Sequence, residues 1–346
     1  MAAAADAAEL PEDRADLMYH EYTGGGVTAL GPAVLVRKSL LDRFSLSASY
    51  YVDMVSNASI DVVTQASPYK ETRQEYGVGL DYVYRDSLIS LGGTTSHEPD
   101  YTADSLSVDV SQEVFGGMTT VAAGYTHGWD EVRKHNTPGF SATAAHWQYR
   151  LGVTQVLTPR WLASLNLEAI SDDGYLASPY RAVRVFGAWI PERDPSTRAS
   201  RAVTLRVAGD IGSRSALRAE YRYFWDTWDV RAHTAQLDYS RYFGRQWLVD
   251  GYFRYYRQEH ALFYSDNFTS EFRYMSRNRQ LSSFDSLGPG AKVSYTMWSV
   301  PSRYEVKLNG SYQWVDFKYS DFTDVRTGRP YSFNASVFEL FVSATY

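Results

Sequence analysis

Cysteine is absent from the 346-residue chain, which excludes disulfides, thiolate metal sites and a cysteine nucleophile. A chain without cysteine is compatible with an oxidising compartment outside the cytoplasm. No stretch approaches the roughly 18 consecutive apolar residues of a membrane-spanning helix, so a helical membrane protein is excluded. The net charge is only −6 and no basic run stands out, which argues against nucleic acid as a partner.

Aromatic residues are plentiful, with 28 Tyr, 16 Phe and 9 Trp, and such side chains suit pleated sheets. The chain closes on "SVFELFVSATY", where Phe338, Leu340, Val342, Ala344 and Tyr346 alternate with mostly polar residues. The same alternation recurs upstream, for example in "FSLSASYYVDM" (44–54), "EYGVGLDYVYR" (75–85), "LRAEYRYFW" (217–225) and "YEVKLNGSYQW" (304–314). A period of two over so many segments predicts strands with one apolar and one polar face.

The connectors between these segments are alternately short and long. Short ones are expected at 38–43, 84–87, 115–117, 157–160, 211–215, 243–246 and 299–303. Longer or more polar ones are expected near 24–26, 56–73, 96–101, 130–139, 172–199, 226–230, 261–278 and 320–330. Seven short and eight other connectors predict about sixteen strands with both termini at the short-turn end. A short extra hairpin at "RVFGAWI" (184–190) would change this count by two.

The polar face distinguishes a membrane barrel from a soluble β-sandwich. It carries too many charges for a dry protein core, because burying an unpaired charge is prohibitively unfavourable. The apolar face often begins or ends with Tyr or Trp, as at the two interfaces of a membrane. The predicted fold is therefore all-β: a closed antiparallel transmembrane barrel with short periplasmic turns and longer extracellular loops, in a bacterial outer membrane. The mean hydropathy of −0.37 agrees with this, because each barrel strand is apolar on one face only.

Two further expectations concern the ends of the chain. Small residues in "MAAAADAAELPEDRADL" resemble those around a signal-peptide cleavage site, so residues 1–15 are expected to form a periplasmic segment after signal removal. Residues 16–346 are then expected to form a single barrel. The terminal aromatic Tyr346 is expected to act as the assembly signal that the barrel assembly machinery recognises.

Charged residues on the polar face of successive strands are the candidate pore-lining residues. They are Asp53, Asp81, Asp109, Glu113, Arg150, Glu168, Arg206, Asp210, Arg218, Glu220, Arg222, Asp238, Asp250, Arg254, Lys292, Glu305, Lys307 and Glu339. Both signs occur on neighbouring strands, so cross-strand pairs are expected. One interpretation is a permeation path that orients charged solutes. The other is a structural network of ion pairs that holds the barrel and partly fills it.

The longest connector, residues 172–199, is a candidate constriction loop, because long loops without secondary structure are often functional. Arg181, Arg184, Trp189 and Arg193 would line the constriction if this segment folded over or into the mouth. A surface loop packed on its neighbours is the alternative.

Several long stretches resemble the family called domain of unknown function 3570, bacterial proteins of outer-membrane barrel type. The resemblance rests on "AELPEDRADLMYHEY", "GPAVLVRKS", "YYVDMVSNASIDVVTQASPY", "GWDEV", "ISDDGYLASPYRAVR", "EYRYFWDTWDVRAHTAQLDYSRYF", "YRQEHALFYSD", "RQLSSF" and "ELFVSATY", which span nearly the whole chain. It implies a large outer-membrane barrel and supplies no substrate or catalytic residues. Family members tend to occur near extracytoplasmic redox and flavin-attachment proteins, which hints at a periplasmic or surface redox partner.

The function expected from these observations is a non-enzymatic, porin-type barrel that passes or docks small solutes through a charged lumen. The alternatives are a plugged barrel that holds a redox partner at the membrane, and a membrane-barrel hydrolase. None of the seven histidines stands in a tight spacing with Ser and Asp, which argues against the hydrolase. No metal or cofactor is predicted. The expected partners are the lipid bilayer and the assembly machinery, and the sequence leaves the oligomeric state open.

Overall fold

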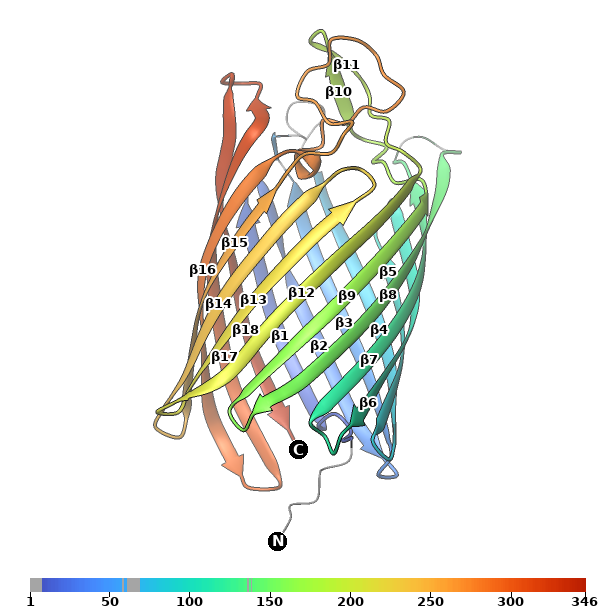
Figure 1. The fold of residues 1–346 in the computed structure, drawn as a ribbon. Coiled ribbons are helices and arrows are strands. Elements are labelled where there is room, and N and C mark those ends of the chain that lie inside the picture. Colours follow the sequence, from blue (N-terminus) through green and yellow to red (C-terminus); the bar gives the residue numbers. More distant parts are fainter. Residues whose placement is uncertain (1–7, 58, 61–68, 136, 138) are drawn as a thin grey trace.

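The computed structural model describes residues 8–57, 59–60, 69–135, 137 and 139–346. Within these residues the chain forms a closed antiparallel barrel, and a separate two-stranded sheet lies above one end (Figure 1). The barrel order β1-β18-β17-β16-β15-β14-β13-β12-β9-β8-β7-β6-β5-β4-β3-β2 contains sixteen strands, as predicted.

Most strands are longer than the roughly 9–11 residues that cross a membrane, so they extend beyond it. The first eight barrel strands are β1 (Arg14–Gly24), β2 (Val27–Leu40), β3 (Phe44–Asn57), β4 (Tyr69–Tyr84), β5 (Ser87–His97), β6 (Tyr101–Val114), β7 (Thr119–Arg133) and β8 (Ser141–Thr158). The other eight are β9 (Trp161–Gly174), β12 (Thr197–Gly212), β13 (Ser215–Asp226), β14 (Arg231–Phe243), β15 (Trp247–Gln258), β16 (Phe284–Val300), β17 (Tyr304–Asp324) and β18 (Arg329–Thr345).

The first and last strands close the cylinder. They pair over the whole of β1, from Arg14 opposite Thr345 to Gly24 opposite Ala335. Closure leaves no free sheet edge, which a bilayer requires because hydrocarbon offers backbone amides no hydrogen-bond partner. The strand β1 begins at Arg14, two residues before the boundary expected from the sequence.

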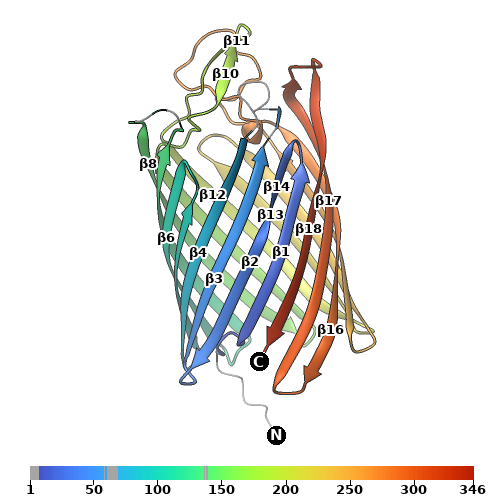
Figure 2. The ribbon, with the colours of Figure 1, turned by 180° about the vertical axis from the view of Figure 1, so that it is seen from behind.

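All seven predicted short turns join strands at one end of the barrel, where β1 also begins and β18 ends (Figures 1 and 2). We call this the short-turn end and the other the long-loop end. The expected long connectors lie at the long-loop end, although residues 58, 61–68, 136 and 138 within them, and residues 1–7 of the expected periplasmic segment, lie outside the described residues. In the connector between β1 and β2, Gly25 and Gly26 adopt φ values of 59° and 81°, which glycine reaches at little cost.

The outer face of the barrel carries the exposed apolar side chains. In mid-strand they are aliphatic, such as Leu205 and Leu237, each 50% exposed, or aromatic, such as Tyr221 opposite Leu205. Exposed aromatic rings lie near both strand ends: Trp129 toward the long loops, and Tyr84, Phe243 and Trp247 toward the short turns, among others. Bands of aromatic rings near both strand ends, around an apolar outer face, are typical of barrels in a bilayer. No helix among the described residues is long and apolar enough to cross a membrane.

Two connectors fold together above the long-loop end. The expected extra hairpin exists as β10 (Ala182–Val185) and β11 (Ala188–Pro191), but it pairs only with itself and does not join the barrel. The connector 259–283, which contains the 3-10 turn η1 (Arg279–Leu281), lies beside it (Figures 1 and 2). We call segments 175–196 and 259–283 together the cap. In the views of Figures 1 and 2, no described segment runs through the middle of the barrel.

Candidate functional site: a charged inner face below a folded cap

The strand register places all eighteen predicted lumen residues on one face of the sheet. Because directly paired residues point to the same side, Arg150 opposite Glu168 and Arg206 opposite Glu220 share a face, and the relation carries from strand to strand. The exposed aliphatic side chains, such as Leu205, occupy the other parity. The eighteen residues therefore form the inner face of the cylinder. Whether they line an open path stays a prediction.

Many of these charges meet a partner of opposite sign. Arg206 pairs with Glu220 on the next strand, at 2.6 Å, and Arg218 pairs with Asp238 at 2.9 Å. Two further pairs reach across an intervening strand: Arg150 to Asp109 at 2.9 Å, and Arg222 to Glu168 at 3.1 Å. Lys307 also pairs with Glu305 on its own strand.

Other predicted residues have different contacts. Asp53 lies 2.7 Å from His20 Nε2, Asp81 accepts a hydrogen bond from Ser90, and Glu339 accepts one from Ser311. Asp210 accepts from the backbone N–H of Gly212. Glu113, Asp250, Arg254 and Lys292 form no ion pair among the described residues, although Lys292 lies over the ring of Phe341. The inner face is thus partly a paired network and partly free charge.

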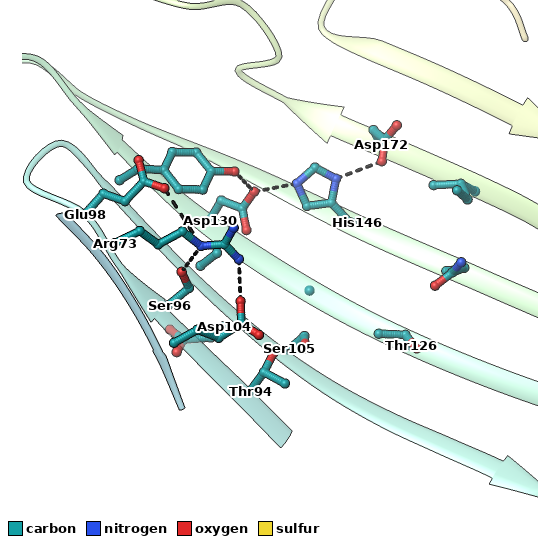
Figure 3. Close-up of a pocket in the computed structure, with 16 residues that line it drawn as sticks. Arg73, Thr94, Ser96, Glu98, Asp104, Ser105, Thr126, Asp130, His146 and Asp172 are labelled. Atoms are coloured by element: carbon teal, nitrogen blue, oxygen red, sulfur yellow. Dashed lines mark hydrogen bonds and ion pairs between the residues drawn. The ribbon is translucent and has the colours of Figure 1, made fainter. Parts of the chain in front are cut away.

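A cavity of about 550 Å³ lies on the inner face of β4–β9, near the long-loop end (Figure 3). His146 bridges two carboxylates there: its Nε2 lies 2.7 Å from Asp130 and its Nδ1 2.7 Å from Asp172. Tyr101 donates a hydrogen bond to Asp130 from the other side. Four neighbouring strands, β6 to β9, therefore contribute to one hydrogen-bonded chain along the wall.

Arg73 lines the β4 side of the same cavity. Its Nε donates to Ser96 at 3.0 Å, and the guanidinium also pairs with Glu75 and lies 4.0 Å from Glu98. Burial raises the pKa of Glu98, and the positive charge of Arg73 partly offsets this effect. The carboxylates on this wall outnumber the cationic groups, so the cavity presents a net acidic surface. No hydrogen bond joins His146 to a serine or threonine in the described chain, so no nucleophile is paired with it.

Sequence reasoning missed this cavity, because residues 96–101, 130–139 and 172–199 were expected to be connectors. The strands instead continue beyond the membrane, β7 to Arg133 and β9 to Gly174, and carry Asp130 and Asp172 on their inner faces. The signal was present in "HGWDEVR", where Trp129 and Glu131 alternate with Asp130.

Backbone hydrogen bonds hold the two segments of the cap together. The N–H of Phe268 donates to the carbonyl of Arg184 at 2.7 Å. Met275 and Arg193 donate to each other's carbonyl groups, at 2.8 and 2.9 Å. Val183, Phe268 and Met275 form a small buried core between the segments. A larger core, mainly aromatic, joins 259–283 to the connector 227–230 and to the ends of β17 and β18, and it includes Trp228, Tyr319, Phe322 and Tyr331. The long connector is therefore a packed structure.

Ionisable groups are buried inside the cap. Arg277 is fully buried, pairs with Asp266 at 2.7 Å, donates to the carbonyl of Thr323 at 2.7 Å and lies over the ring of Phe322. Glu192 accepts hydrogen bonds from Ser276 Oγ at 2.7 Å and from the N–H of Arg277 at 2.6 Å.

Asp194 lies two residues further along this segment. Burial, together with the charge of Glu192, raises the pKa of Asp194 to about 7. Nothing in the sequence pattern singled out these groups, although the run of aromatic residues between 261 and 278 is unusual for a loop that stays unpacked.

The predicted constriction residues belong to this cap. Arg184 lies over the Trp189 ring, and Arg193 pairs with Glu271 at 2.7 Å on the exposed side. The positive charge of Arg181 lowers the pKa of Asp194 and so partly offsets the effect of burial. The hairpin β10–β11 stands above the rim (Figure 1), and whether it narrows the path stays a prediction.

Tyr346, the predicted assembly signal, lies at the short-turn end of the barrel. The Lys38 ammonium lies over its ring, 4.9 Å from the centroid. Among the residues that the structure describes, no group of three or more His, Asp or Glu is arranged to hold a metal ion.

The family described as "Protein of unknown function (DUF3570)" has a model that matches residues 128–312, more than half of the chain. The chain belongs to this family. The match includes the inner wall from β8 to β16 and the whole cap. No curated protein matches the sequence.

Solved structures resemble this family member in fold. A bacterial polysaccharide outer membrane secretin superposes with a TM-score of 0.52 at 10% identity, covering 96% of this chain and 99% of the secretin. The siderophore receptor PirA from Pseudomonas aeruginosa gives a TM-score of 0.46 at 9% identity, with coverage of 96% and 81%. A Pseudomonas aeruginosa FadL homologue gives 0.44 at 11% identity, with coverage of 97% and 90%. The secretin comparison supports the fold of an outer-membrane barrel, and the fold alone.

Proposed function

We propose that this barrel is a non-enzymatic channel of the outer membrane that passes small polar solutes, and that solutes reach the lumen past the acidic wall of β4–β9. The observation that carries the proposal is the continuous charged inner face of a closed sixteen-strand cylinder. Barrels of this size leave room for an aqueous channel once side chains are in place. Charge on such a wall selects solutes by sign.

The route past β4–β9 follows from where the mouth is filled. The aromatic core of the cap packs against the connector 227–230 and the ends of β17 and β18, which leaves that part of the mouth apolar and occupied. The cavity beside β4–β9 is polar and holds Glu98, Asp130 and Asp172. Small cations and neutral solutes should therefore pass more readily than anions.

Conductance in planar bilayers tests this proposal. Under a KCl gradient the wild-type protein should give a reversal potential of the sign for cation preference, and Glu98→Gln with Asp172→Asn should reduce it. Asp229→Asn removes an exposed carboxylate on the connector 227–230 at the same end, so it is the matched control and should change little. A cation preference that survives the double substitution would contradict the route.

Liposome swelling separates a channel from a plugged scaffold. Proteoliposomes should swell in solutions of small sugars if the lumen is open. Absence of swelling would indicate a plugged barrel and would refute the channel. Deleting residues 178–196 tests the cap as a constriction. The deletion should raise single-channel conductance, and an unchanged conductance would refute a narrowing role for Arg181, Arg184, Trp189 and Arg193.

A further inference from the structure

Arginine is concentrated in the short turns. Six of the seven turns carry one exposed arginine each, and the turn 115–118 is the exception. We call these six the turn arginines: Arg43, Arg85, Arg160, Arg214, Arg245 and Arg303. Only two carboxylates, Asp42 and Asp86, lie within the same turns. The short-turn end is thus locally positive although the whole chain has a net charge of −6.

The turn arginines also differ from many of the other arginines in their ion-pair partners. None of the six forms an ion pair among the residues that the structure describes. Arginines at the long-loop end are often paired, for example Arg133 with Glu131, Arg231 with Asp229 and Arg326 with Asp324. Unpaired guanidinium groups at one end of the molecule are available to an external anion.

Two turn arginines occupy backbone positions that suit other residues. Arg85 has φ of 55°, and Ser213 and Arg214 have φ of 53° and 61°, as in a type I′ turn. Glycine and asparagine adopt this left-handed region at lower cost than arginine. Turn geometry therefore does not account for arginine at these two positions.

Aromatic rings near the short-turn end contact guanidinium groups of neighbouring arginines. Arg85 lies over the Tyr84 ring at 5.2 Å, and Arg241 of β14 lies over the Phe243 ring at 5.3 Å. Both rings are about half exposed, with Tyr84 at 48% and Phe243 at 51%. A ring at the membrane interface with a guanidinium beside it places the positive charge where lipid phosphates lie.

We propose that the turn arginines, together with Arg241, bind the phosphates of anionic phospholipids around the short-turn end. Guanidinium groups bind phosphate through paired hydrogen bonds. The six turns are distributed around the circumference of the barrel, from β2–β3 to β16–β17, so they follow the lipid annulus. A protein partner docked at this end would contact only part of the barrel circumference. Lipid is therefore the better match for arginines that surround the barrel.

Native mass spectrometry of the purified barrel tests the proposal. Detergent-solubilised protein is incubated with phosphatidylglycerol or phosphatidylcholine, and the bound lipids are counted. The wild type should retain several phosphatidylglycerol molecules and few phosphatidylcholine molecules. Equal retention of the two lipids would overturn the proposal.

The site variant combines Arg85→Asn, Arg214→Asn and Arg241→Gln. Its phosphatidylglycerol affinity should fall by about fivefold for each arginine that contacts lipid, because a cation near an anionic surface contributes about that factor. The control combines Arg231→Gln, Arg273→Gln and Arg329→Gln, three exposed arginines at the long-loop end, of which Arg273 also lies over an aromatic ring. The control should bind lipid like the wild type.

The asparagines keep the test interpretable if lipid binding changes. Because asparagine suits the left-handed positions, the site variant should stay folded, which heat-dependent migration on gels checks. A folded site variant that retains its phosphatidylglycerol would overturn the proposal, as would an equal loss in the control. Tighter binding of an acidic protein than of any lipid, lost in the site variant, would assign the ring to a protein partner instead.

Discussion

The Asp194→Asn substitution is expected to stabilise the closed cap at neutral pH. Asp194 is partly buried beside Glu192 and has a pKa of about 7 in the closed cap, compared with 3.8 for an ordinary aspartate. Arg181 and Arg198 favour the ionised form but only partly offset burial. A neutral amide at this position removes the cost of burying a second negative charge.

The sign and size follow from the two pKa values. Below about pH 3.8 the carboxyl is protonated in both states, so closure is unaffected by this group. Between pH 3.8 and 7 an opened cap releases the proton while the closed cap keeps it, so closure weakens as pH rises. A difference of about 3 pKa units corresponds to roughly 4 kcal/mol of closure free energy lost above pH 7.

Hydrogen exchange at the amides that join the cap segments measures this loss. Protection factors, corrected for the intrinsic pH dependence of exchange, should fall between pH 4 and 7 for Phe268 and Met275 in the wild type. In Asp194→Asn they should stay nearly constant, while Asp229→Asn, which removes an exposed carboxylate outside the cap, should follow the wild type. An equal pH dependence in the wild type and in Asp194→Asn would refute the reasoning.

Three further substitutions test other parts of the structure. Leu205→Arg puts a charge on the lipid face and should destabilise the barrel by about 2–4 kcal/mol in urea unfolding from liposomes, whereas Thr204→Arg, one residue away on the inner face, should cost far less. Arg277→Met should destabilise the closed cap by about 3–5 kcal/mol, because Asp266 loses its buried partner, and should speed proteolysis within 259–283. Deleting Tyr346 should lower the heat-modifiable, assembled fraction in cells, yet leave the urea midpoint of refolded barrel close to wild type, because this terminal ring is 49% exposed.

The barrel was predictable because one physical rule acts on every strand. Lipid on one side and water on the other require apolar and polar side chains to alternate along each strand. Neighbouring residues such as Leu217 and Arg218 therefore indicate which face of the sheet each occupies. The turns were predictable for a similar reason, since each interrupts the alternation over a few residues. The strand number of sixteen is confirmed and all seven short turns lie within or overlap their predicted ranges, whereas several strand ends at the long-loop end lie in segments predicted as connectors.

The cap and the cavity follow no such local rule. Residues of the cap that bond to one another, such as Arg193 and Met275, are about eighty positions apart, and no periodicity connects them. The cavity escaped for another reason: outside the bilayer a strand no longer needs an apolar outer face. Glu131 and Asp173 can therefore stand on outward positions, and the alternation that marks a strand fades where Asp130 and Asp172 lie.

Arginine shows how the same side chain is used in three environments of this barrel. Within the cap, the buried Arg277 has a carboxylate, a carbonyl and an aromatic ring around it, because an unpaired buried charge would cost more than the cap could tolerate. On the inner face Arg206 and Arg218 also have carboxylate partners although water is near, so these pairs set direction and spacing more than stability. At the short turns the carboxylate partner is missing, and Arg214 even occupies a backbone position that disfavours it. Arginines without an ion pair also occur elsewhere, such as Arg254 on the inner face. The short turns, however, repeat such an arginine in six of seven connectors of the described chain. This repetition around the barrel argues that the missing anion at the turns belongs to the membrane.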